Sequence, residues 1–203
     1  MPFTPSEIAQ TERQSIRTQI RQARRALTAE QQSTYATQAA KLMLTQPKIL
    51  EAKHLALYLS NDGELDTAPL IQALWALGIK LYLPRLHPFS QGNLIFMAYT
   101  PETEMLKNSY GIAEPKLDIR GLIPSEKLDV IITPLVAFDT QGNRMGMGGG
   151  YYDRTLASHR SQDKPYPVGY AHDCQQLDSL PCEHWDVPLP LLITPTQVLK
   201  FNI

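Results

Sequence analysis

The residues of this sequence best suited to chemistry lie in a short glycine-rich segment, residues 144–153. Its glycines let the backbone adopt positive φ and approach a ligand closely, and successive exposed N–H groups ahead of a helix make a site for phosphate. Arg144 adds a cationic, bidentate donor, and Asp153 supplies a carboxylate that can hold Mg²⁺ through one or two oxygens. The segment therefore indicates a phosphate-binding loop, and a flexible surface turn is the alternative.

The segment matches neither of the two common nucleotide-binding fingerprints. A Walker A loop places lysine and then serine or threonine after its last glycine, whereas Gly150 is followed by Tyr151 and Tyr152. The dinucleotide pattern needs a third glycine where Tyr151 stands. The tyrosines offer flat aromatic faces on which a planar ring can stack, and packing is the alternative.

A second basic element lies on the N-terminal helix that the sequence predicts. At 100° per residue, Arg13, Arg17 and Arg24 lie on one side, roughly 50–90° from the apolar stripe of the helix. The stripe comprises Ile16, Ile20, Ala23 and Leu27. The three arginines either complete a polyphosphate site or form a solvated basic face with packed stems.

Four possible zinc ligands form an H-x-C…C-x-H pattern near the C-terminus: His172, Cys174, Cys182 and His184. In common zinc frameworks the cysteines are two to four residues apart, and here the separation is larger. We therefore favour unpaired cysteines that are buried as small hydrophobes, in a reducing compartment.

Helices that alternate with short apolar strands predict an α/β fold with a largely parallel sheet. A capping box at residues 4–7 begins the first helix and a second box at 28–31 begins another, which extends to about residue 45. Expected strands cover residues 54–60, 79–83, 94–100, 128–138, 166–170 and 191–194, with further helices at 68–77 and 151–158. Pro84 is expected to end the second strand.

Composition sets the broad class of the protein. The chain has 203 residues, 43% hydrophobic and 19% charged, with a net charge of −1. These values suit one domain spanning residues 1–203, without the bulk charge that recruits nucleic acid or anionic lipid. No apolar run approaches the roughly 18 residues of a spanning helix. We expect a cytoplasmic protein with no membrane or nucleic-acid partner, either a monomer or a weak homodimer.

Several motifs occur in an order that we know from one family. The most specific string comprises residues 134–139, 142–146, 148 and 150–153, and the weaker motifs are Arg13-x-x-x-Arg17, 58–60 with 64–67, 110–115 and 185–188. On these motifs the chain resembles the 5-formyltetrahydrofolate cyclo-ligase family, also called methenyltetrahydrofolate synthetases, over nearly its whole length.

The resemblance implies a three-layer α/β sandwich with an N-terminal helical hairpin. It also implies ATP as co-substrate, Mg²⁺ as cofactor and a small-molecule folate as substrate. Implied ATP contacts are Arg13, Arg17, Arg144, Met145, Gly146, Met147, Gly148, Gly149, Gly150, Tyr151 and Tyr152. Implied folate contacts are Leu59, Glu64, Tyr110, Tyr151 and Tyr152; catalytic residues are Arg144, Tyr152 and Asp153; metal ligands are Asp153 and Asp186.

The implied reaction transfers the γ-phosphoryl group of ATP to the formyl oxygen, after which N10 of the folate attacks the activated carbon. Three positions depart from the family pattern. Arg13 stands where many relatives have lysine, and Gly149 stands where some have lysine. Pro190 stands where many relatives have aspartate. Two alternatives remain at this point. One is a non-catalytic relative that binds folate or nucleotide, and the other is a sugar-phosphate enzyme on a similar scaffold.

Overall fold

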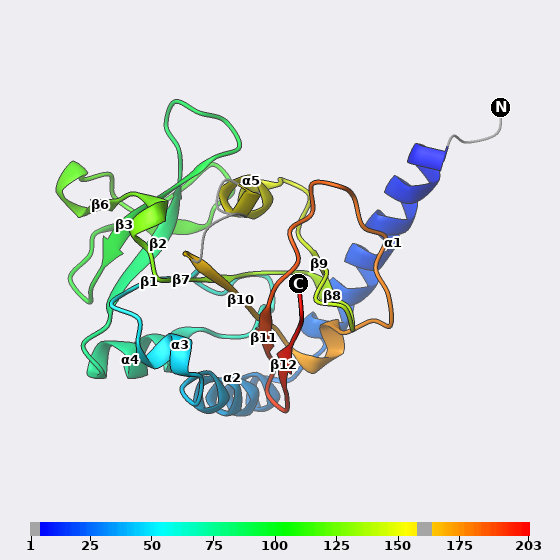
Figure 1. Ribbon diagram of the computed structural model, residues 1–203, viewed down its shortest axis with the longest axis horizontal. Helices are drawn as coiled ribbons and strands as arrows, with labels where there is room; N and C mark the ends of the chain where they lie inside the picture. Colours follow the sequence, from blue (N-terminus) through cyan, green and yellow to red (C-terminus); the bar gives the residue numbers. More distant parts are fainter. Residues whose placement is uncertain (1–4, 158–163) are drawn as a thin grey trace.

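An eight-stranded mixed sheet forms the centre of the computed structural model, which describes residues 5–157 and 164–203 (Figure 1). Across the sheet the strands are β12 (Val198–Lys200), β11 (Leu191–Ile193), β10 (Tyr166–Tyr170), β7 (Val130–Thr133), β1 (His54–Ala56), β2 (Lys80–Leu86), β3 (Leu94–Tyr99) and β6 (Leu122–Ile123). The run from β11 to β2 is parallel, whereas β12, β3 and β6 each pair antiparallel with their inner neighbour.

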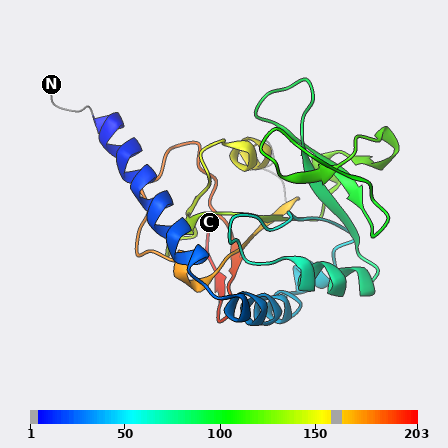
Figure 2. The same cartoon turned by 180° about the vertical axis from the view of Figure 1, so that it is seen from behind.

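Helices cover both faces of the sheet. One face carries α2 (Ala29–Met43), α3 (Pro47–Leu50) and α4 (Ala68–Ala76), and the other carries α5 (Tyr151–Ala157). The long helix α1 (Pro5–Arg25) lies at one side, beside the hairpin of β8 (Ala137–Phe138) and β9 (Arg144–Met145), as the view from behind also shows (Figure 2). The remaining short elements are the hairpin of β4 (Met105–Lys107) and β5 (Ala113–Pro115) and the 3-10 turns η1 (Ile119–Gly121), η2 (Ser125–Lys127) and η3 (Asp173–Gln175). The expected three-layer α/β sandwich with its N-terminal pair of helices is confirmed.

Alternating burial along the central strands produces the two cores. In β7, Val130 and Ile132 pack into the core under α2 and α4, whereas Ile131 packs into the core under α5. Leu55 and Ala56 of β1 divide between the cores in the same way. Successive side chains of a strand point to opposite faces, so strands covered on both faces read as continuous apolar runs.

Two proline positions differ from the expected strand boundaries. β2 continues through Pro84, which pairs with Phe96 of β3. The parallel pairing of β1 with β2 extends only to Tyr82, so the missing N–H of Pro84 faces a side where β1 has already ended. Proline is tolerated at such a position. Pro134, by contrast, divides the predicted strand 128–138 into β7 and β8.

The residues that α1 buries differ from the predicted apolar stripe. Ile20 packs with Val136 and Met145 in a small third cluster. Ala23 is exposed, and the neighbouring Arg24 is fully buried. The end of α1 faces a polar turn rather than the apolar sheet, so a charged side chain takes the buried position.

Both cysteines, Cys174 and Cys182, are exposed. The expectation that they are buried is therefore wrong, because both lie in surface segments after β10. No group of three or more metal-ligating side chains occurs within residues 5–157 and 164–203. No helix in those residues is long and apolar enough to cross a membrane. The predicted capping residue Thr4 and helix end Ser158 lie outside the described residues.

The capping box at the start of α2 is confirmed and can be tested. Thr28 Oγ1 accepts a hydrogen bond from Gln31 N, and Gln31 Oε1 accepts one from Thr28 N. We expect Thr28→Ala to lower the free energy of unfolding by about 1 kcal/mol in urea denaturation, because an N–H at the helix start loses its acceptor. The matched control is Thr37→Ala in the exposed middle of the same helix, which we expect to change stability by less than about 0.5 kcal/mol. Equal losses from both variants would contradict a capping role.

Candidate active site

A cavity of about 730 Å³ lies where β1, β2 and β7 end. The carboxyl ends of parallel strands are the usual place for a ligand in an open α/β sheet. Its walls come from α1, the turn after β1, the second half of β2, the β4–β5 hairpin, the segment after β7 and the glycine loop, residues 146–150. Segments that are far apart in the sequence therefore share one enclosed space.

The two ends of the glycine loop are joined by an ion pair. Arg144 Nη2 donates to Asp153 Oδ1 at 2.7 Å, so the end of β9 is tied to the first turn of α5. The same oxygen accepts a hydrogen bond from Val187 N at 3.3 Å. Arg144 is only 3% exposed, and its Nε has no hydrogen-bond acceptor among the described residues. Burial lowers the pKa of Arg144 from its ordinary value, while the charges of Asp153 and Asp186 oppose that effect.

The loop backbone uses conformations that favour glycine. Gly148 has φ +102° and Gly150 has φ +65°. A Cβ atom at Gly150 would lie 2.8 Å from Arg154 Nη1. Arg154 also donates to Gly149 O and, at 2.7 Å, to Gly92 O. The positive φ values therefore favour glycine at positions 148 and 150, and a Cβ at position 150 would also require the guanidinium of Arg154 to move.

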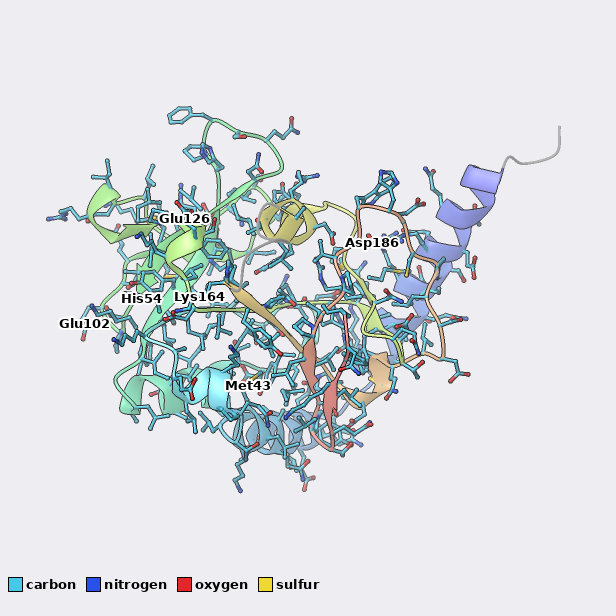
Figure 3. The ribbon with its side chains drawn as sticks, in the orientation of Figure 1. Met43, His54, Glu102, Glu126, Lys164 and Asp186 are labelled. Carbon is cyan, nitrogen blue, oxygen red and sulfur yellow. The ribbon has the colours of Figure 1, made fainter. Side chains whose placement is uncertain are left out.

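Two arginines of α1 contact the loop and its surroundings. Arg17 Nε donates to Gly146 O at 2.9 Å. Arg13 pairs with Asp186 at 2.7 Å, in the segment that runs between α5 and α1 (Figure 3). Asp186 also accepts from Glu183 N, so both of its carboxylate oxygens have partners. Arg17 is thus placed at the loop and Arg13 at Asp186, and neither belongs to a solvated face.

The opposite wall of the cavity contains a polar turn with a partly buried carboxylate, Glu64. Glu64 Oε2 accepts a hydrogen bond from Asn61 N at 3.0 Å. Burial raises the pKa of Glu64 to about 7, although the charge of Arg24 opposes the rise. Carboxyl groups with a pKa near neutrality are common at functional sites, so Glu64 is the strongest candidate for ligand recognition on this wall.

Three arginines of α1 hold the turn through Asp62. Arg21 and Arg24 donate to Asp62 Oδ2 at 2.7 and 2.8 Å, and Arg25 pairs with Oδ1. Partial burial opposes ionisation of Asp62, but these hydrogen bonds outweigh it and hold its pKa at about 2. The sequence predicted only a turn at Asp62 and did not predict this cluster. The sequence signal for this cluster was a set of arginines one helical turn apart, together with a single aspartate that can pair with them.

Aromatic residues surround the cavity. The hydroxyl groups of Tyr110 and Tyr151 are 3.1 Å apart and join the β4–β5 hairpin to α5. Tyr152 lines the interior, where burial and the charge of Glu64 raise the pKa of its phenol well above the ordinary value. The cavity therefore offers apolar walls with a few polar groups, which is the usual composition of a small-molecule site.

Most of the residues implied by the resemblance meet in this cavity. Its lining includes Leu59, Glu64, Tyr110, Arg144, Gly146, Met147, Gly149, Gly150, Tyr151, Tyr152 and Asp153. Gly148 instead lines a neighbouring cavity of about 310 Å³ together with Trp185. Met145 is buried in the cluster beneath α1. Asp186 lies next to Arg13, outside the main cavity.

One buried ion pair at the cavity was missed by sequence reasoning. Glu114 pairs with Arg85 at 2.7 Å and accepts hydrogen bonds from Leu86 N and Asn108 Nδ2. Glu114 joins the β4–β5 hairpin to β2. No local pattern could have indicated this contact, because the partners belong to different hairpins.

A protein-family model, that of the 5-formyltetrahydrofolate cyclo-ligase family, matches residues 9–195. The chain belongs to this family. A 5-formyltetrahydrofolate cyclo-ligase of Escherichia coli K12 is 56% identical over 182 residues, which cover 90% of this chain and 100% of the relative. The enzyme of that name from Haemophilus influenzae is 51% identical, with 87% and 94% covered. The chain is therefore a cyclo-ligase, an enzyme that forms a C–N bond.

Solved structures agree with the family. The NMR structure of Aquifex aeolicus 5,10-methenyltetrahydrofolate synthetase superposes with a TM-score of 0.79 at 28% identity, covering 94% of this cyclo-ligase and 93% of the other chain. A 5,10-methenyltetrahydrofolate synthetase from Mycoplasma pneumoniae gives a TM-score of 0.70 at 26% identity, with 90% and 98% covered. Membership also removes the sugar-phosphate enzyme as an alternative.

The turn that carries Glu64 gives a testable consequence of close packing. Gly63 has φ +73°, and a Cβ there would lie 3.3 Å from the carbonyl oxygen of Arg24. Gly78 has φ +75° with nothing within 4 Å of its Cβ position. We expect Gly78→Ala to lower unfolding free energy by about 1 kcal/mol, from backbone strain alone. Gly63→Ala should lower it by at least about 1 kcal/mol more, because the neighbouring helix backbone must also shift. Equal losses in urea denaturation would show that the turn is not packed against α1.

Proposed function

We propose that this cyclo-ligase converts 5-formyltetrahydrofolate to 5,10-methenyltetrahydrofolate with consumption of ATP in the presence of Mg²⁺, and releases ADP and phosphate. One observation carries the proposal. A single cavity joins a partly buried carboxylate, Glu64, to a glycine loop that is flanked by the paired Arg144 and Asp153. The first group suits a polar heterocycle, and the second suits a polyphosphate.

The chemistry must turn an amide-like oxygen into a leaving group. The formyl oxygen attacks the γ-phosphorus of ATP, the bond from that phosphorus to the β,γ-bridging oxygen breaks, and ADP leaves. N10 then attacks the activated formyl carbon and loses its proton. The C–O bond breaks, and the former formyl oxygen departs in inorganic phosphate. Because no protein nucleophile is needed, the enzyme contributes alignment and charge stabilisation.

The loop and its arginines supply that stabilisation. Arg144 lines the cavity, so its guanidinium would place a fixed positive charge beside the phosphate oxygens. Arg17 is already hydrogen-bonded to the carbonyl of Gly146, which fixes a second positive charge at the loop. Cationic and N–H donors held in place before the reaction stabilise charge that develops on the transferred group.

A magnesium ion fits Asp153 better than Asp186. Among the described residues, the hydrogen bonds that Asp153 accepts from Arg144 and Val187 both end on Oδ1. Both oxygens of Asp186 are engaged by Arg13 and the backbone. Mg²⁺ is usually held by one or two carboxylates together with substrate phosphates, so one available carboxylate oxygen is sufficient here. Bound in this way, Mg²⁺ would neutralise charge on the phosphate oxygens.

The folate ring would occupy the other end of the cavity. We propose that Glu64 accepts hydrogen bonds from pterin N–H groups while Leu59 and Tyr152 pack on the flat ring. Tyr110 and Tyr151 lie at the exposed side of the cavity, where they would enclose the substrate. The cytoplasmic location and the monomeric or weakly dimeric state stay predictions.

The direct test mixes purified protein with 5-formyltetrahydrofolate and MgATP. We expect near-ultraviolet absorbance of the methenyl product to rise together with an equal amount of ADP. Omission of either substrate or of Mg²⁺ should abolish both signals. Binding of both ligands with neither product nor ADP would instead identify a non-catalytic relative.

Substitutions at the ion pair test the assigned roles. We expect Arg144→Ala and Asp153→Asn each to lower kcat/KM at least tenfold, about 1.4 kcal/mol of transition-state stabilisation, because each removes a group that contacts phosphate or its metal. Arg120→Ala, at an exposed residue paired only with Asp118, is the control and should retain parental kinetics. If either site variant folds and its kcat/KM stays within about twofold of the parent, the role of that residue is refuted.

A further inference from the structure

Arg24 is the one arginine of α1 that is completely enclosed, with 0% of its side chain exposed. Its Nε donates to Asp62 O and its Nη2 to Asp62 Oδ2, both at 2.8 Å. The backbone is also engaged, because Arg24 O accepts a hydrogen bond from Gln32 Nε2. Burying a charged group is costly unless it is paired, so this position is built for a guanidinium.

One nitrogen of Arg24 is not used by these contacts. Nη1 has no hydrogen-bond acceptor among the described residues and lies 3.9 Å from Glu64 Oε1. Glu64 Oε2 is hydrogen-bonded to Asn61 N, which leaves Oε1 beside the guanidinium. Arg24 thus donates two hydrogen bonds to Asp62. Its third guanidinium nitrogen faces Glu64, the side chain that we propose binds the folate.

We propose that Arg24 is a positioning residue for folate recognition, which fixes the 61–64 turn and favours the ionised form of Glu64, the form that accepts hydrogen bonds from the pterin. The inference rests on the proposed function, since it deepens the role of the same cavity. It adds a residue that none of the motifs indicated, and one that acts through Glu64 without contacting the substrate.

The charges around Glu64 make its ionisation depend on Arg24. The groups facing it are Arg24 from α1, Asp62 in its own turn, Tyr58 after β1, Tyr152 on α5 and, at the backbone of the turn, His172 after β10. Burial raises the pKa of both phenols far above neutrality, and burial lowers the pKa of His172 to about 4. Asp62 has a pKa of about 2. Near pH 7, therefore, Glu64 is the group of this set that titrates.

The sign of the effect follows from these charges. Glu64 has a raised pKa of about 7, so its ionised, hydrogen-bond-accepting form is gained as pH rises through that value. Removal of Arg24 takes away the opposing positive charge and leaves Asp62 less neutralised. Both changes raise the pKa of Glu64 further, and folate binding then recovers only at higher pH.

The test is the equilibrium dissociation constant of 5-formyltetrahydrofolate from about pH 5.5 to about pH 9, without ATP, so that nucleotide phosphates do not titrate. The variants are Arg24→Met, Arg24→Lys and the control Arg25→Met. Arg25 also pairs with Asp62 but is half exposed and lies outside the cavity lining. We expect the midpoint of the pH dependence to move up by about one unit or more in Arg24→Met, with affinity near pH 7 about tenfold weaker.

The other variants separate charge from anchoring. Arg24→Lys keeps the positive charge but not the two hydrogen bonds to Asp62. Folate affinity should therefore fall by the same factor at every pH, while the midpoint stays within about 0.3 units of the parent. Arg25→Met should move the midpoint by less than about 0.3 units, because Arg25 is half exposed and its charge is screened by solvent. If Arg24→Met does not fold, Arg24→Gln replaces it, because glutamine is neutral and can still donate to Asp62.

Three other results would contradict either the inference about Arg24 or the proposed function. An unchanged midpoint in the neutral Arg24 variants, with affinity lost equally at all pH values, would overturn the inference and leave Arg24 a purely structural residue. A midpoint shift of the same size in Arg25→Met would also overturn it, since any charge near Asp62 would then suffice. A parent protein that does not bind 5-formyltetrahydrofolate would refute the proposed function itself, which is a separate result.

Discussion

The buried ion pair between Arg144 and Asp153 is the constraint on which the rest of the site depends. It joins the end of β9 to the first turn of α5 and so determines the path of the four glycines between them. Asp153 extends the tie to the C-terminal segment at Val187. A buried pair is costly when one partner is missing, so loss of either Arg144 or Asp153 would disturb the path of the loop.

The helix α1 extends this constraint across the whole cavity. Near its middle, Arg17 contacts the glycine loop, and at its end Arg24 holds the turn of Glu64. The two proposed ligand positions are therefore braced by one rigid element that packs on the β8–β9 hairpin and not on the central sheet. Fixed geometry of this kind suits a reaction in which the enzyme mainly aligns two substrates.

Local rules predicted the elements better than they predicted the site. The capping box at Thr28 and the apolar strands follow from interactions within a few residues, and both are found. Burial of Arg24 could not be predicted, because it depends on a carboxylate 38 residues away at Asp62. The strand end predicted at Pro84 is wrong for a similar reason, because the free-energy cost of proline in a strand depends on where the neighbouring strand ends. The family motifs indicated the glycine loop, Arg17, Arg144 and Glu64, and the structure added the pairing of Arg21, Arg24 and Arg25 with Asp62.

The central claim is that one cavity holds a polyphosphate at the glycine loop and a reduced pterin beside Glu64. A crystal structure with 5-formyltetrahydrofolate and a non-hydrolysable ATP analogue tests it most directly. The expected map has phosphate oxygens against the backbone of residues 146–150 and Arg144, and the formyl oxygen facing the last phosphorus. Density for both ligands elsewhere, with residues 146–150 contacting neither, would contradict the claim.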